Sequence, residues 1–259
     1  MTSLEPAQDV LLAGAALVAG AVNAVAGGGS LISFPALLAV GYPALTANVT
    51  NSVALTPGYF GGTLGYRREL TGQRGRILAL GATSAIGAVV GAALLLVSSQ
   101  ALFELIVPWL IFLACGLLAV QPRLARLVRD RRPGGPAGTD GHIAPLFAAQ
   151  FLAAAYGAYF GAGVGIMMLA ILGIFLSDSL QRLNALKGLL SFLISLVAAV
   201  YFALLADVSW VAVAVMAVAS LLGGQLGVLL ARRLNDQVLR WLVITFGVAV
   251  GVRLLLAAG

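Results

Sequence analysis

Charged residues are scarce in this chain of 259 amino acids, where they make up 9% of the total. Soluble domains carry about 25% charged residues, whereas here 61% of residues are hydrophobic and the mean hydropathy is +1.05. This composition excludes a soluble globular protein and a disordered chain, because too little polar surface is available to cover the apolar side chains. The apolar residues run in long blocks without alternation, which excludes a β-barrel. The chain is therefore predicted to be an all-α polytopic membrane protein.

Residues that carry out catalysis are also few. The chain has one cysteine, Cys115, and one histidine, His142, so no intramolecular disulfide is possible and no apolar block contains a histidine. It has no H-E-x-x-H, P-loop or G-x-S-x-G motif, and no pair of carboxylates at membrane depth. We therefore expect no enzymatic activity, no ATP hydrolysis, no cofactor and no bound metal ion.

Apolar segments account for most of the chain. Ten are found, at roughly 10–26, 30–41, 47–66, 77–97, 102–120, 143–160, 164–176, 185–205, 209–231 and 238–257. A helix needs about 20 residues to cross a bilayer, so 30–41 and 164–176 are short. Each follows a glycine-rich stretch, Gly27–Gly29 or Gly161–Gly165. The pattern predicts about eight full spans and two short helices, each belonging either to a helical hairpin or to a broken helix.

Arginines mark one side of these segments. Twelve of the fourteen lie in 67–76, 121–142 and 232–240, and Arg253, near the outer end of the last segment, is discordant. The connections 42–46, 98–101 and 206–208 contain neither lysine nor arginine. By the positive-inside rule the basic loops are cytoplasmic, which places both termini outside. The net charge of +6 is explained by this bias and gives no indication of nucleic-acid binding.

The chain contains an internal repeat. A displacement of 136 residues places Gly27 on Gly163, Gly29 on Gly165 and Asn48 on Asn184 without gaps. A linker at 121–142 then separates a first repeat, 1–120, from a second, 143–259. Because each half has five segments, the second half starts on the opposite side of the membrane. Inverted repeats of this kind are typical of secondary transporters, whose substrate binds near the midplane.

Polar side chains within the apolar segments are candidates for such a site. Lys187 is the only lysine, and a charge at the centre of a membrane helix costs about 2.5–3.5 kcal/mol. It either faces an anion-binding cavity or extends to the cytoplasmic headgroups. Asn48 and Asn51 share a helical face, and Asn184 and Lys187 occupy the equivalent places in the second half. These pairs either coordinate a substrate or join helices through hydrogen bonds.

The glycine stretches also have two interpretations. They free backbone N–H groups at helix N-termini, which suit an anion, and Ser30 is placed to cap the helix that follows it. Small residues equally permit close helix packing, which is the interpretation favoured for the sets Ser84/Gly87/Gly91 and Ser220/Gly223/Gly227. The predicted substrate-binding residues are Gly27, Gly28, Gly29, Ser30, Asn48, Asn51, Gly163, Gly165, Asn184 and Lys187.

These motifs resemble the sulfite exporter TauE/SafE family. The first half is similar to it over NAVAGGGSLISFPALLAVGYPALTANVTNSVAL and PGYFGGTLGYRREL, and the second over GAGVGIMMLAILGIFLSDSLQRLNALKGLLS. The resemblance implies a bacterial inner-membrane permease of the kind often linked to export of sulfite or organosulfur anions.

The resulting hypothesis is a secondary transporter that moves a small, sulfur-containing anion by alternating access. Its partners would be the anion and the lipid bilayer, with a coupling ion left open and no nucleic acid. The alternative is a membrane scaffold or assembly factor without flux, which predicts a stable partner protein and no stabilisation by solutes.

The inverted arrangement predicts that the connections 98–101 and 121–142 lie on opposite sides of the membrane. With Cys115 replaced and single cysteines introduced, an impermeant thiol reagent added outside should label the first loop and not the second. Labelling of both loops from one side would refute the arrangement.

Overall fold

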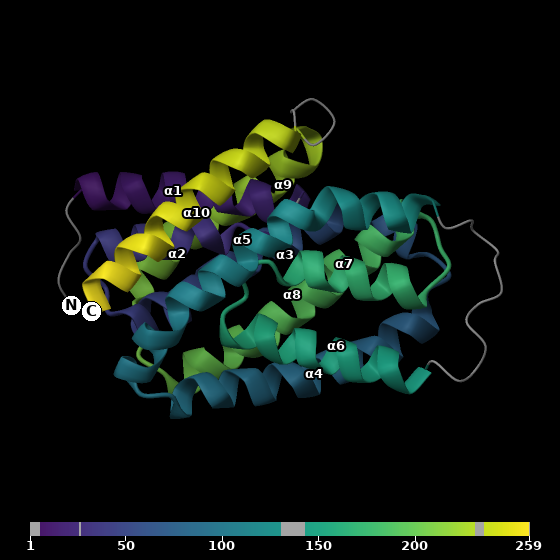
Figure 1. Cartoon of the computed structure of the whole chain (residues 1–259), viewed down its shortest axis with the longest axis horizontal. Helices are drawn as coiled ribbons and strands as arrows, with labels where there is room; N and C mark the ends of the chain where they lie inside the picture. Colours follow the sequence, from purple (N-terminus) through teal and green to yellow (C-terminus); the bar gives the residue numbers. More distant parts are fainter. Residues whose placement is uncertain (1–5, 26, 131–142, 231–235, 259) are drawn as a thin grey trace.

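The computed structural model describes residues 6–25, 27–130, 143–230 and 236–258, and over these ranges every regular element is helical (Figure 1). The elements are α1 (Pro6–Val25), α2 (Ser30–Ala39), α3 (Ala44–Gly65), the 3-10 helix η1 (Arg67–Leu70), α4 (Arg74–Val97), α5 (Gln100–Asp130), α6 (Ile143–Tyr159), α7 (Val164–Phe175), α8 (Leu180–Leu205), α9 (Trp210–Leu230) and α10 (Asp236–Ala258). The helix α5 continues into the segment expected to be a linker, and 131–142 lie outside the described residues.

Several helices have the length and apolar character that a bilayer requires. Within the described ranges, five segments are long and apolar enough to cross a membrane: Pro6–Ala24, Arg74–Val97, Gln100–Leu124, Leu180–Leu205 and Trp210–Gly227. Large apolar side chains such as Ile86, Leu204 and Leu256 are exposed on the outer helices. Lipid solvates such a surface, while each helix satisfies its own backbone groups. An all-α polytopic membrane protein is thus confirmed, and the number of spans and the inverted repeat stay predictions.

Both short helices form hairpins with the helix that precedes them. The helix α2 packs along α1, and α7 packs along α6. Gly29 lies directly against the carbonyl oxygen of Ala19, whereas ten residues of continuous helix would separate the two by about 15 Å. The chain therefore reverses direction at each glycine-rich stretch, which decides for hairpins over broken helices.

The first helix of each half packs against the fourth helix of the other half. The helix α1 contacts α9, and α6 contacts α4 along one edge of the molecule (Figure 1). Gly87 and Gly91 of α4 lie against the backbone of α6, while Gly223 and Gly227 of α9 lie against that of α1. Since a Cβ at any of the four would collide with main-chain atoms, these glycines serve close packing, as the sequence favoured.

Alanine at these contacts should destabilise the fold. We expect Gly91→Ala and Gly223→Ala each to lower the free energy of unfolding by about 1–3 kcal/mol, because the methyl group overpacks a backbone contact. The matched control is Gly116→Ala, since no heavy atom lies within 4 Å of that added Cβ. Melting curves in detergent should show a lower melting temperature for the first two variants only. Equal melting temperatures for all three would contradict the packing described.

Candidate functional site

The tips of the two hairpins meet inside the protein. The N–H of Gly163 donates a hydrogen bond to the carbonyl oxygen of Gly27 over 3.1 Å. A Cβ at Gly27 would lie 2.9 Å from the Cα of Gly165. Gly27 and Gly163 also have φ angles of 84° and 78°, which side-chain-bearing residues rarely adopt. The tips thus cross backbone against backbone, with no room for a side chain.

Polar side chains satisfy the backbone groups that the hairpin turns leave free. Asn23 Oδ1 accepts from the N–H of Gly29 at 2.7 Å. The Tyr156 hydroxyl donates to the carbonyl of Ala162 at 2.7 Å. The prediction that Ser30 caps α2 is wrong, because the cap position is Gly29 and the Ser30 side chain makes no capping hydrogen bond. Asn23, one turn before the tip, performs this role because its amide reaches across the hairpin.

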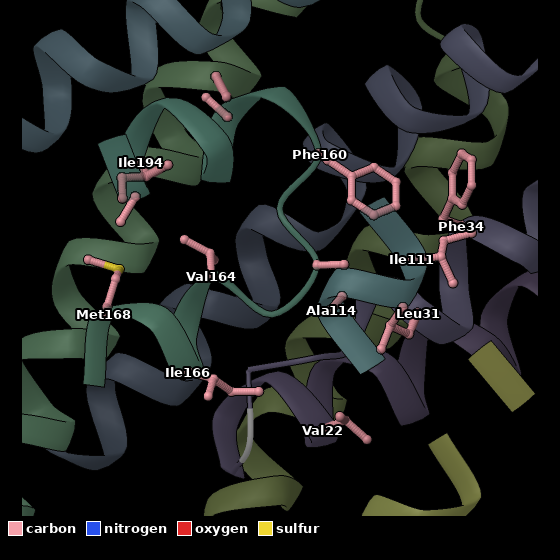
Figure 2. Close-up of a cluster of buried hydrophobic side chains, with 14 of the residues drawn as sticks. Val22, Leu31, Phe34, Ile111, Ala114, Phe160, Val164, Ile166, Met168 and Ile194 are labelled. Atoms are coloured by element: carbon pink, nitrogen blue, oxygen red, sulfur yellow. The ribbon is translucent and has the colours of Figure 1, made fainter. Parts of the chain in front are cut away.

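Apolar side chains from both halves enclose the crossing. Figure 2 shows Val22, Leu31 and Phe34 of the first hairpin near Phe160, Val164 and Ile166 of the second, with Ile111 and Ala114 of α5 beside them. The rings of Phe34 and Phe160 meet edge to face, with their centroids 5.6 Å apart. The crossing is therefore surrounded by apolar side chains from both halves of the chain.

A cavity beside the crossing brings together four of the predicted residues. It lies between α1, α3 and α8 and reaches the hairpin tips. Its lining consists of Asn23, Ala24, Gly27, Tyr59, Gly62, Thr63, Tyr66, Gly165, Asn184, Lys187, Gly188 and Ser191. Of the predicted set, Gly27, Gly165, Asn184 and Lys187 are present. We call this the lysine cavity.

Lys187 is the dominant electrostatic feature of the lysine cavity. Its position in α8 is about 10 Å from the first residue of that helix, and the residue is only 5% exposed. Its Cδ and Cε lie next to Gly165, where an added Cβ would be 3.7 Å and 3.8 Å from them, an ordinary van der Waals contact. No hydrogen bond or ion pair joins its ammonium to another residue that the structure describes. This position fits the interpretation in which Lys187 faces a cavity, and not the one in which it extends to the cytoplasmic headgroups.

A second cavity lies on the other side of Tyr59 and Ser191, which line both. Its lining consists of Ser30, Ser52, Leu55, Tyr59, Gly157, Phe160, Gly161, Val164, Ser191, Ile194, Ser195 and Ala198. Ser30 is therefore the one predicted residue that lines it. The hydroxyl groups in this lining carry no formal charge. We call this the serine cavity.

The remaining predicted residues are buried but line neither cavity. They are Gly28, Gly29, Asn48, Asn51 and Gly163. Asn48 donates from Nδ2 to the carbonyl of Tyr159 at 2.8 Å, at the end of α6. Asn48 thus makes the interhelical bond that the sequence left as the alternative to substrate binding. Asn184, its equivalent in the second half, lines the lysine cavity.

Sequence reasoning missed most of the neutral polar residues in the lysine cavity. These are Asn23, Tyr59, Thr63, Tyr66 and Ser191. Helical spacing gives a signal for two of them, because Ser191 follows Lys187 by four residues and Thr63 follows Tyr59 by four. Nothing in the sequence indicates that α3 presents this face to α8.

An ion cluster stands next to the start of α8. Asp178 contacts Arg76 at 2.6 Å and Arg182 at 3.0 Å. Arg182 also donates to the carbonyl of Thr71 at 3.0 Å. Burial by itself would raise the pKa of Asp178, but hydrogen bonds from the Ser179 backbone and from the two guanidinium groups lower it overall. Both arginines are thereby held by a carboxylate outside the lining of the lysine cavity.

Comparisons with known proteins agree on one family. The family model described as sulfite exporter TauE/SafE matches residues 12–254. The "Probable membrane transporter protein ORF9" of Sinorhizobium sp. is 25% identical over 244 residues, covering 93% of this chain and 90% of that protein. A "Probable membrane transporter protein" of Haemophilus influenzae is 28% identical over 228 residues, covering 88% and 86%. The "Probable membrane transporter protein YfcA" of Escherichia coli K12 is 24% identical over 241 residues, covering 93% and 87%. No solved structure gives a significant match.

The Asp178 cluster predicts a pH-dependent stability. Because folding lowers the pKa of Asp178, its ionised form stabilises the fold above the ordinary value of 3.8. That stabilisation is lost as the pH falls below this value. Asp178→Asn should cost about 1 kcal/mol at pH 7, and its melting temperature should approach that of the wild type below about pH 4. An undiminished difference at pH 3 would contradict the assignment.

Proposed function

The chain belongs to the sulfite exporter TauE/SafE family of membrane transporters, and we propose that it is a secondary transporter for a small anion of the sulfite or organosulfur class. The transport would take place across a bacterial inner membrane by alternating access. The observation that carries the proposal is Lys187, a buried ammonium that lines a cavity and has no carboxylate partner among the described residues.

The environment of Lys187 favours an anion as its partner. A buried charge without a partner is costly, and an opposite charge that enters the cavity offsets much of that cost. The Thr63 hydroxyl donates to the carbonyl of Tyr59 and the Ser191 hydroxyl donates to the sulfur of Met168. The neutral donors left for an anion are the amides of Asn23 and Asn184 and the hydroxyl of Tyr59. The oxygens of sulfite or of a sulfonate accept such bonds. The site therefore combines one cation with several neutral donors and contains no carboxylate.

The two cavities support alternating access. The displacement that relates the halves also relates their linings: Ala24 to Phe160, Gly62 to Ala198, Ser52 to Gly188, Leu55 to Ser191 and Tyr59 to Ser195. The same displacement relates the first residues of α3 and α8, of α4 and α9, and of α5 and α10. In the proposal, each cavity opens to one side of the membrane, and Tyr59 and Ser191 lie between them.

Contacts between distant connections agree with the predicted sidedness. Arg76, at the cytoplasmic end expected for α4, contacts Asp178 in the connection between α7 and α8. Tyr42 and Ser209 share a hydrogen bond of 2.8 Å, and both lie in or next to connections expected outside. Each contact thus joins segments that the proposal places on one side, and the lysine cavity lies toward the cytoplasmic end of α8.

The proposal predicts a strong effect at Lys187. Proteoliposomes that contain the wild-type protein should release labelled sulfite, and Lys187→Ala should reduce the initial rate at least tenfold, because loss of one partner of a buried charge pair costs about 2–5 kcal/mol. The matched control is Arg68→Ala, which removes an exposed cation. Size-exclusion profiles and melting temperatures establish that each variant is folded.

Two results would contradict the proposal. Wild-type protein that releases neither sulfite nor a sulfonate would argue for the scaffold alternative, and a search for a bound partner protein would then follow. Flux that is equal in the wild type and in folded Lys187→Ala would remove the lysine cavity from the path.

A further inference from the structure

The lysine cavity contains one formal charge. Lys187 is its only lysine or arginine, no aspartate or glutamate lines it, and its other polar residues are neutral amides and hydroxyls. From this count we infer that the site selects singly charged anions against dianions and against neutral molecules of the same shape. The inference rests on the proposed function and specifies the substrate charge that the site accepts.

The neighbouring basic residues do not add to this charge. Arg182 lies in α8 five residues before Lys187, and Arg76 lies at the start of α4. Both contact Asp178, at 3.0 Å and 2.6 Å, and neither lines the cavity. Asp178 balances one of the two guanidinium charges, and both arginines stand outside the lining, so Lys187 is the one formal charge that lines the cavity.

Two backbone N–H groups at the hairpin tips are occupied within the protein. A helix N-terminus attracts anions through free backbone N–H groups. At α2, the N–H of Gly29 bonds Asn23, and at the start of α7 the N–H of Gly163 bonds Gly27. These two donors are occupied within the protein, so neither is available to a second negative charge.

The lysine cavity should therefore bind a solute of charge −1 more tightly than a neutral solute or a dianion of the same shape. A monoanion neutralises Lys187, and the neutral donors complete its hydrogen bonds. A dianion leaves one charge uncompensated at a buried site, where desolvation penalises it heavily. A neutral solute leaves the ammonium itself uncompensated. For sulfite, the accepted form would be hydrogen sulfite.

Three small molecules test the charge without changing the shape. Dimethyl sulfone, methanesulfonate and sulfate all have a tetrahedral sulfur, and near neutral pH their charges are 0, −1 and −2. Each is used as a competitor of labelled sulfite efflux from proteoliposomes that contain the full chain. Methanesulfonate should inhibit at a concentration at least tenfold lower than either of the others. Sulfate that inhibits as well as methanesulfonate would overturn the inference.

A second cation should shift the preference. Asn184 lines the same cavity three residues before Lys187, so Asn184→Lys places two ammonium groups on one face of α8. We expect inhibition by sulfate, relative to methanesulfonate, to rise at least tenfold in this variant. The matched control is Asn184→Gln, which keeps the site neutral at that position and should keep the wild-type order.

The outcomes distinguish a failure of the charge selectivity from a failure of the proposed transport. Sulfite efflux with equal or stronger inhibition by sulfate overturns the charge selectivity and leaves the transporter intact. Absence of efflux for sulfite and sulfonates overturns the proposed function and the inference with it. If Asn184→Lys does not fold, as judged by its melting temperature, the wild-type series still decides.

Discussion

The arrangement of this protein depends on pairing the backbone groups at the ends of two helical hairpins in its interior. A helix leaves N–H groups free at its start and carbonyls free at its end, and lipid offers them no partner. Here the partners are an asparagine, a tyrosine hydroxyl and the other hairpin: Asn23 bonds Gly29, Tyr156 bonds Ala162, and Gly163 bonds Gly27. The last of these bonds joins the two halves of the chain at the edge of the lysine cavity, which Gly27 lines.

Much of the fold follows from periodicity and from small residues. Long apolar blocks predict the helices, and glycine-rich breaks predict a hairpin or a broken helix at each short segment. Spacing by three or four residues places Asn184, Lys187 and Ser191 on one face of α8. Such patterns describe one helix at a time. They do not say that α3 contributes Tyr59 and Thr63 to the same cavity, because that depends on which helix packs opposite.

For the same reason, the sequence equivalence of Asn48 and Asn184 does not give them equivalent surroundings. Asn48 lies about 16 Å along α3 from Tyr59, beyond the lysine cavity, and it bonds the end of α6. Equivalent positions in the two halves therefore hold the same residue type in different surroundings. The cation is likewise confined to one half, since Asn51 stands at the place equivalent to Lys187. A single charge limits the cost of inserting the protein into the membrane and is sufficient to define the polarity of the cavity.

The crossing of the hairpins also determines how they can move against each other. Most interior contacts interlock side chains, so one element leaves another only after several rotamers change. Gly27 and Gly165 face each other without side chains. The tips therefore meet backbone against backbone, and the hydrogen bond from Gly163 to Gly27 that joins them is worth about 1 kcal/mol. Since no side chains interlock at the tips themselves, the contacts that oppose sliding of one hairpin against the other come from the apolar side chains packed around them.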